Sequence, residues 1–280
     1  MLRLAKDTVT SIYSEAAEAP DEKTRTELAT WALRSEAVER IKAMLSLAES
    51  EPDIPVEPKC LDADPMLLNC DNGTVDLHTG KLREHRRQDL ITKLALVIYD
   101  LDARSDLWDE FLSEATGGDD ALVIFLQRAA GYSLTGDTSE EVLFFIHGPQ
   151  AAGKSTFVEA IKTVLGGYAT TADFEAFLSR REVGGPRNDI ARLAGSRFVA
   201  SIEVDEGKKL AEGLVKMLTG GDTVTARKLY QEAFEFRPTF KLWLAANHTP
   251  RVREDDEAMW RRILTVPFIH TVPKGQRSQV

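Results

Sequence analysis

The segment 148–155 limits what this chain can fold into more than any other feature. It reads Gly-Pro-Gln-Ala-Ala-Gly-Lys-Ser and fits the pattern GxxxxGK[ST]. An apolar run at 142–146 precedes it, and a run with helical character follows at 156–161. In this strand–loop–helix order, backbone N–H groups and a helix N-terminus can surround a phosphate. The sequence therefore predicts a nucleotide-binding loop that follows a buried strand.

The chemistry of this loop assigns roles to two side chains. We expect Lys154 to hold the β- and γ-phosphates and the hydroxyl of Ser155 to ligate Mg²⁺. The alternative is a glycine-containing surface loop with an exposed lysine, and the flanking strand and helix disfavour it. The residues predicted to bind the nucleotide are Gly148, Pro149, Gln150, Ala151, Ala152, Gly153, Lys154, Ser155 and Thr156.

Four short apolar runs in the second half of the chain define the fold class. They lie at 142–146, 198–202, 240–246 and 263–268. Near-continuous apolar runs of this length are typical of strands buried on both faces. They predict an α/β fold in which helices cover a mainly parallel sheet.

The first half of the chain changes character at a proline-rich stretch. Residues 1–50 have helical periodicity, with Asp21 after Pro20 as the expected cap, and three prolines between 52 and 58 interrupt the pattern. A strand is expected at 74–77 and helices at 105–135. We predict a helical segment (1–50), a mixed β/helical domain (51–140), a P-loop core (141–270) and a flexible tail (271–280).

Polar side chains follow two of the apolar runs. Glu203 and Asp205, with Glu206 beside them, come directly after 198–202, and Asn247 follows 240–246. The carboxyl ends of parallel strands face the ligand crevice, where a carboxylate can hold Mg²⁺ or activate water. The amide of Asn247 can hydrogen-bond a γ-phosphate or the attacking water. Taken singly, each of these residues is also compatible with a solvated strand end or a turn.

Arg261 and Arg262 precede the last apolar run. Paired arginines usually face solvent, but ATPases that work as rings need an arginine that reaches a neighbour's γ-phosphate. One of this pair is therefore a candidate for that role.

A basic segment lies between the second and third runs. Gly220-Gly221 forms a turn signal, and the β-prone stretch 223–229 carries Arg227 and Lys228, with Tyr230 just beyond it. A hairpin with this tip could hold single-stranded backbone and stack a base. A solvated strand edge blunted by charge explains the same residues equally well.

Composition excludes several classes of protein. The net charge of −10 argues against a surface that coats nucleic acid everywhere, although a local basic patch remains compatible with it. The two cysteines, Cys60 and Cys70, exclude a disulfide scaffold and a four-cysteine zinc site, and favour a reducing cytoplasm. No apolar run reaches the length of a membrane span, and early charges in the first seven residues argue against a signal peptide.

The order of these motifs resembles the superfamily 3 helicases, and within them the helicase domain of the phage/plasmid primase-helicases of satellite-phage and poxvirus type. The ordered motifs include Lys216-x-x-x-Gly220-Gly221-Asp222, and the most specific stretch is 236–243 with 246–251. The segments similar to the region that precedes the ATPase in that family are 64–69, 72–77, 89–93 and 127–136.

The resemblance implies an AAA+-like P-loop NTPase with a three-layer core. It implies a hexameric ring that hydrolyses ATP with Mg²⁺ and moves 3′→5′ on single-stranded DNA in a bacterial host. On the matching positions, Lys154 and Ser155 contact phosphate and Mg²⁺, Glu203 is the acidic position, and Asn247 is the sensor. Arg262 matches the arginine finger better than Arg261, and Arg227 and Lys228 fall on the channel hairpin.

The resemblance also sets expectations for partners and for rival functions. Ala152 stands where phage members commonly carry Asn, which matters little because the backbone holds the phosphates. No primase domain precedes the motifs, so we expect no primer synthesis, and a separate primase or replication initiator is an expected partner. The alternatives are a P-loop small-molecule kinase and an ATP-gated adaptor that binds DNA or protein without unwinding.

Overall fold

The computed structural model describes residues 2–52, 54–178, 187–202, 209–247 and 256–271. The chain forms two compact units, Met1–Leu61 and Asp62–Val280. Within the described ranges, no helix is both long enough and apolar enough to cross a membrane.

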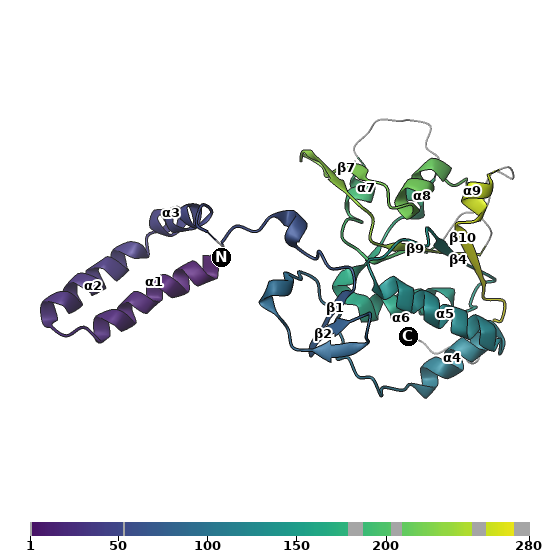
Figure 1. The fold of residues 1–280 in the computed structure, drawn as a ribbon, viewed down its shortest axis with the longest axis horizontal. Helices are drawn as coiled ribbons and strands as arrows, with labels where there is room; N and C mark the ends of the chain where they lie inside the picture. Colours follow the sequence, from purple (N-terminus) through teal and green to yellow (C-terminus); the bar gives the residue numbers. More distant parts are fainter. Residues whose placement is uncertain (1, 53, 179–186, 203–208, 248–255, 272–280) are drawn as a thin grey trace. The chain divides into compact units, whose positions relative to one another are not determined.

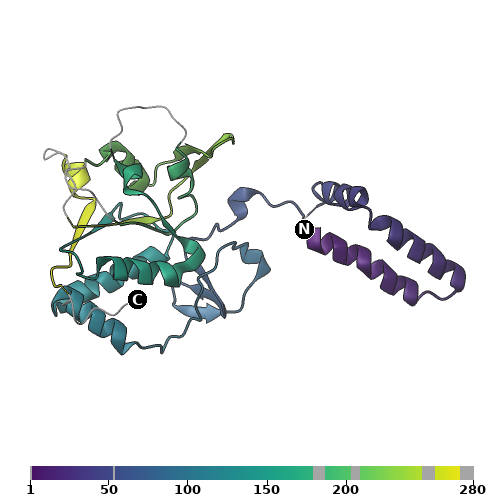
Figure 2. The ribbon, with the colours of Figure 1, turned by 180° about the vertical axis from the view of Figure 1, so that it is seen from behind.

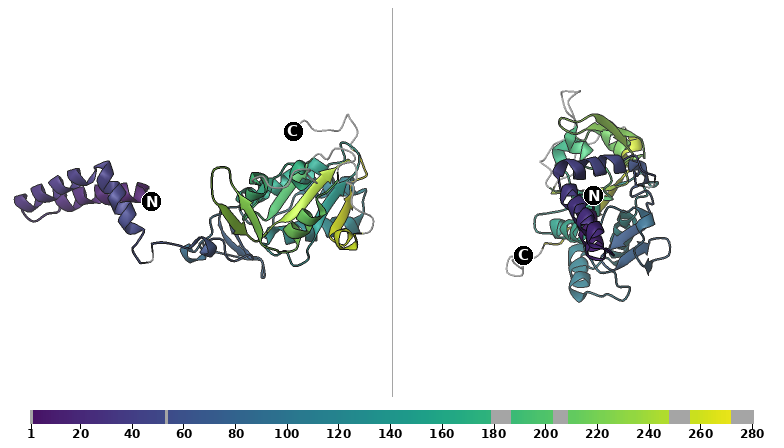
Figure 3. Two further views of the ribbon diagram at one scale, coloured as in Figure 1. Left: turned by 90° about the horizontal axis from the view of Figure 1, so that it is seen from above. Right: turned by 90° about the vertical axis from the view of Figure 1, so that its left-hand side faces the viewer.

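The first unit consists of three helices, as the periodicity of residues 1–50 predicts. They are α1 (Leu2–Ala17), α2 (Glu22–Ser35) and α3 (Val38–Ala48), and the short 3₁₀ turn η1 (Pro58–Cys60) follows. Helix α1 packs along both α2 and α3 (Figure 3). The expected cap at Asp21 is confirmed, because its Oδ1 accepts the backbone N–H of Thr24 at 2.8 Å.

The second unit is built on a five-stranded sheet in the order β10-β4-β9-β6-β5, and every neighbouring pair is parallel. The four predicted apolar runs supply four adjacent strands, so the predicted α/β fold with a mainly parallel sheet is confirmed. Their ends differ from the prediction by at most one residue. The strands are β4 (Leu143–His147), β5 (Ala169–Thr171), β6 (Phe198–Ile202), β9 (Lys241–Ala246) and β10 (Ile263–Pro267).

Helices cover both faces of this sheet and make three layers (Figures 1 and 2). Alternate strand side chains enter two separate cores. Phe144 and Trp243 pack toward α4, α5 and α6, whereas Phe145 and Leu244 pack toward α7 and α8. The helices are α4 (Asp106–Thr116), α5 (Asp120–Leu134), α6 (Lys154–Leu165), α7 (Asn188–Ala191), α8 (Glu212–Thr219) and α9 (Glu257–Trp260).

Shorter elements complete this unit. The predicted strand at 74–77 is part of an antiparallel three-stranded sheet, and a two-stranded hairpin lies elsewhere in the unit. The strands are β1 (Leu67–Cys70), β2 (Gly73–Asp76), β3 (Lys81–Arg83), β7 (Val224–Arg227) and β8 (Ala233–Phe236). The 3₁₀ turns are η2 (Arg87–Asp89), η3 (Gly166–Tyr168) and η4 (Phe174–Phe177).

Two buried cations join residues 62–140 to the large sheet. Arg197, next to β6, donates to the carbonyls of Leu134 and Leu67, both at 2.8 Å. Lys241, the first residue of β9, donates to the carbonyls of Thr135 at 2.5 Å and Asp137 at 3.0 Å. Three of these carbonyls, those of Leu134, Thr135 and Asp137, lie at the last turn of α5 or just beyond it, and that of Leu67 lies in β1. This explains why these residues and the sheet belong to one compact unit.

Lys241 should make stability depend on pH. Burial, with repulsion from Arg197 as a smaller cause, lowers its pKa from 10.5 to about 7. Between these values the folded protein binds fewer protons than the unfolded chain, so the free energy of unfolding should rise with pH. We expect wild type to gain about 1–2 kcal/mol relative to Lys241→Met between pH 7 and pH 9 in urea titrations. Parallel pH profiles for the two proteins would contradict this.

Candidate nucleotide-binding site

The loop 148–153 joins β4 to α6 through backbone conformations that favour glycine. Gly153 has a φ of 86°, and Gly148 has a φ of 150°. A Cβ at Gly148 would overlap the carbonyl oxygen of Phe268, and one at Gly153 would lie 2.8 Å from the ring of Phe111. Neither position has room for a side chain, because a strand end and a helix pack directly behind the loop. The loop is therefore held in a curved shape by the fold around it.

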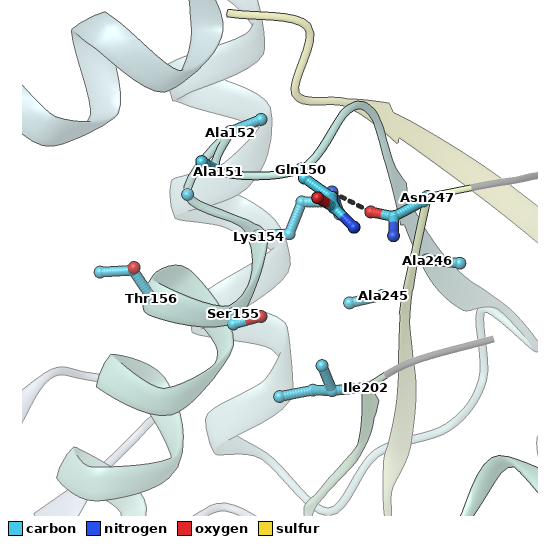
Figure 4. A pocket seen from close by; sticks show the side chains of 11 residues that line it. Gln150, Ala151, Ala152, Lys154, Ser155, Thr156, Ile202, Ala245, Ala246 and Asn247 are labelled. Atoms are coloured by element: carbon cyan, nitrogen blue, oxygen red, sulfur yellow. Dashed lines mark hydrogen bonds between the residues drawn. The ribbon is translucent and has the colours of Figure 1, made fainter. Parts of the chain in front are cut away.

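Lys154 is the first residue of α6 and is only 8% exposed. Its Nζ donates to the carbonyls of Gly148 and Pro149, both at 2.7 Å, and to Oδ1 of Asn247 at 3.0 Å (Figure 4). Burial lowers the pKa of Lys154. These acceptors are neutral oxygens, so their hydrogen bonds hold the ammonium in place without cancelling its charge. Such an ammonium is placed to attract an anion.

A cavity of about 320 Å³ opens between the loop, the start of α6 and the ends of β6 and β9. In Figure 4, the hydroxyl of Ser155 faces the strand ends and the side chain of Thr156 points away from them. The amino end of the 12-residue helix α6 adds partial positive charge and free N–H groups at the same place. The residues that line the cavity are Gln150, Ala151, Ala152, Gly153, Lys154, Ser155, Thr156, Ile202, Ala245, Ala246 and Asn247.

The structure brings together some of the predicted site residues, and others lie outside its described part. Asn247, which is 93 residues from Lys154 in sequence, contacts it directly. Glu203 and Asp205, with Glu206, fall outside the described residues, but Ile202, which immediately precedes them, lines the cavity. No group of three or more His, Cys, Asp or Glu that could hold a metal occurs in the described ranges.

The arginine pair lies at the amino ends of the parallel strands, whereas Lys154 lies beyond their carboxyl ends. Arg261 and Arg262 precede β10, which runs parallel to β4, whereas the loop follows the end of β4. A five-residue strand separates the two edges by about 16 Å. Neither arginine is therefore positioned to reach the cavity at Lys154 in its own chain.

The two adjacent arginines differ in burial and in their partners. Arg262 is buried, and it donates to Oε2 of Glu141 at 2.6 Å and to the carbonyl of Ala258 at 2.8 Å. The side chain of Arg261 is 70% exposed, and its Nη2 lies 3.7 Å from the same Glu141 oxygen. Arg262 is thus held inside its own chain, whereas the side chain of Arg261 is mostly exposed although it also pairs with Glu141.

The basic segment forms a hairpin whose turn lies between β7 and β8, whereas the predicted turn at Gly220-Gly221 joins α8 to β7. Strands β7 and β8 pair antiparallel beside α7, and the hairpin stands out from the body of the unit (Figures 1 and 2). Arg227 and Lys228 are exposed, and Tyr230 is 97% exposed. Sequence reasoning missed Leu229, whose apolar side chain is 57% exposed beside Tyr230. The tip thus presents cations, an aromatic ring and an aliphatic side chain together.

Sequence reasoning also missed Phe111, which supports the loop, and Glu141, which holds the arginine pair. Phe111 packs behind Gly153, and Glu141 pairs with Arg262. Glu141 has a φ of 52°, an unusual conformation for a residue other than glycine. No local pattern marks either residue, because each acts through contacts distant in sequence.

Comparisons with known proteins agree with these motifs. A family model described as "D5 N terminal like" matches residues 1–117, and a family of unknown function, DUF5906, matches residues 146–262. A "Putative helicase" of Acanthamoeba polyphaga mimivirus is 30% identical over 229 residues, which cover 78% of this chain and 23% of that protein. "Putative helicase 022R" of Frog virus 3 is 30% identical over 152 residues, covering 52% of this chain and 16% of the relative.

Among solved structures, the apo form of the NrS-1 C-terminal region superposes with a TM-score of 0.49 at 13% identity. The superposed region covers 64% of this chain and 41% of the NrS-1 chain. Both viral relatives are named as putative helicases, and each of the two family models matches less than half of this chain. The chain spans less than a quarter of the length of either viral relative.

Proposed function

We propose that this chain is the ATP-hydrolysing part of a replicative helicase that moves on single-stranded DNA. The observation that carries the proposal is the buried Lys154 ammonium, held by two loop carbonyls and Asn247 at the carboxyl edge of a parallel sheet. A ligand with clustered negative charge is the natural occupant of that cavity. The viral relatives named as helicases support the choice of DNA translocation among P-loop activities.

The residues around the cavity suit a nucleoside triphosphate with Mg²⁺. When the nucleotide binds, Lys154 would exchange one of its neutral acceptors for a phosphate oxygen. The N–H groups at the start of α6 would bind other phosphate oxygens. Ser155 and, from its place after Ile202, Glu203 would hold Mg²⁺, which when bound neutralises charge on the phosphates. Asn247 then hydrogen-bonds the γ-phosphate or the attacking water. Glu203 or Asp205 accepts the proton that the water loses as it attacks. The attack releases ADP and phosphate.

The separation of Lys154 and Arg261 supports assembly into a ring. Each chain carries its proposed phosphate site at the carboxyl ends of the strands and its exposed arginine at their amino ends. Head-to-tail contacts repeated around a closed ring bring the two edges of neighbouring copies together. We propose that Arg261 completes the site of the next subunit in a hexamer, which works with a separate primase or replication initiator.

The β7–β8 hairpin is the proposed contact with DNA. Arg227 and Lys228 would neutralise phosphates, and Tyr230 would stack on a base. We expect single-stranded DNA to stimulate ATP turnover. We expect Tyr230→Ala to weaken DNA binding by about 5- to 100-fold, the cost of one stacked base. Removing Arg227 and Lys228 together should flatten the slope of log affinity against log salt by about 1.4, because each single-strand contact contributes about 0.7.

Trp31→Ala is the matched control for the aromatic side chain. Trp31 is 53% exposed but lies on α2, far in sequence from the hairpin. Turnover and fluorescence-anisotropy binding should be the same for this variant as for wild type. If DNA leaves the ATP turnover of the assembled, active protein unchanged, the proposal of a DNA translocase is wrong. ATP binding with negligible hydrolysis would select the adaptor instead.

A further inference from the structure

An ion pair outside the phosphate site joins α8 to the start of α9. Nζ of Lys216 lies 2.7 Å and 2.5 Å from the two carboxylate oxygens of Asp256. The side chains are 32% and 17% exposed, so solvent screens the pair only partly. Asp256 also caps α9, because its Oδ1 accepts the backbone N–H of Met259 at 3.0 Å. One carboxylate thus fixes where α9 begins and attaches it to α8.

The short helix α9 leads directly into the arginine pair. Arg262 donates back to the carbonyl of Ala258 within α9 at 2.8 Å, and forward to Glu141 before β4 at 2.6 Å. Arg261 lies between these two attachments and keeps its side chain exposed. The position of Arg261 is therefore set by where α9 lies.

The other end of α8 leads to the hairpin. After Thr219 the chain passes through Gly220 and Gly221 into β7. A Cβ at Gly220 would lie 2.8 Å from the carbonyl of Lys216 and 3.7 Å from Nη2 of Arg262. The connection to the hairpin therefore runs close beside the buried arginine, and Lys216 is one turn away from it.

We propose that Lys216 and Asp256 are positioning residues that couple the DNA-binding hairpin to Arg261. A displacement of the hairpin is transmitted through α8, across the ion pair, to α9 and the arginine that serves the neighbouring subunit. The inference rests on the proposed function, since it requires a DNA contact at the hairpin and an arginine acting on ATP in a second copy. It assigns to Lys216 a role in coupling, separate from binding either DNA or ATP.

The test compares ATP turnover with and without an oligothymidylate strand in the full chain. Lys216→Met removes the charge and keeps the length, whereas Asp256→Asn weakens the pair and retains a side chain that can cap α9. We expect either variant to lower the DNA-stimulated to basal ratio by about 2- to 30-fold, the range reported for residues that carry coupling. DNA affinity by anisotropy and ATP affinity by thermal shift should stay at wild-type values.

Several controls make the outcome decisive. The double variant should lose no more than either single variant, because both remove the same link. Lys216→Arg should restore the ratio, and Lys162→Met, which breaks the Lys162–Glu159 pair on α6, should leave it unchanged. An unchanged ratio in Lys216→Met and Asp256→Asn, or a parallel loss of DNA affinity, would overturn the coupling. Wild type lacking any DNA response would instead refute the proposed function itself.

Discussion

Replacing Lys154 with methionine should abolish ATP turnover, with a loss on the order of 10²–10³-fold or more. Lys154 is the positively charged residue among the described residues that line the cavity. Electrostatic contacts to a transferring phosphoryl group change rates by at least this much. Methionine keeps the length and apolar stem of lysine, so the packing around α6 is preserved. Turnover measured with Mg²⁺ and ATP at saturating DNA checks the expectation.

Stability measurements separate this effect from misfolding. Without nucleotide, Lys154→Met should unfold at the same temperature as wild type or higher, because it removes a buried charge. ATP should raise the melting temperature of wild type and not of the variant, because only wild type binds it tightly. Lys162→Met, on the same helix in an exposed pair with Glu159, should behave as wild type in both assays. Full turnover by Lys154→Met would exclude this cavity as the ATP site.

Replacing Arg261 with alanine should lower turnover by roughly 10³–10⁵-fold, the effect of an arginine supplied to a transferring phosphate by a neighbour. ATP affinity should change little, because the loop, Lys154 and Asn247 of each chain remain intact. Arg262→Ala should act differently. It leaves Glu141 without its buried partner and should reduce the free energy of unfolding by about 1–3 kcal/mol.

Mixing two inactive variants tests whether Arg261 acts on a second copy. Lys154→Met retains the arginine, and Arg261→Ala retains the phosphate site, so mixed assemblies contain some complete interfaces. Turnover should reappear on mixing and should depend on the ratio of the two proteins. No recovery in assemblies confirmed as mixed by native mass spectrometry would contradict an arginine supplied in trans. If only Arg262→Ala lost ATP turnover, and its stability were unchanged, then Arg262 and not Arg261 would be the arginine that acts on the neighbouring subunit.

Local sequence patterns predicted the scaffold of the site well. The four apolar runs became adjacent parallel strands, and burial of β4, β6 and β9 on both faces is a requirement that shows directly in composition. The fourth run, β10, lies at the edge of the sheet and is only partly buried. Asp21 caps α2 through a contact three residues away, so the local sequence contains the whole signal. The contact between Lys154 and Asn247 followed once both were assigned to the same edge of the sheet.

The choice between Arg261 and Arg262 shows what local patterns could not determine. The two residues are identical in type and adjacent, and only Arg262 is buried, with a 2.6 Å hydrogen bond to Glu141, which is 121 residues away in sequence. The Lys216–Asp256 pair is similar, since it joins residues 40 apart through the packing of α8 and α9.

The sequence alone predicted the strand, loop and helix around 148–155, four of the five strands of the large sheet and the place of Asn247 near Lys154, because those depend on spacing and polarity along a few neighbouring positions. Only the tertiary structure decided which charges are paired inside the chain and which remain exposed. Burial and ion pairing depend on groups brought together from distant segments.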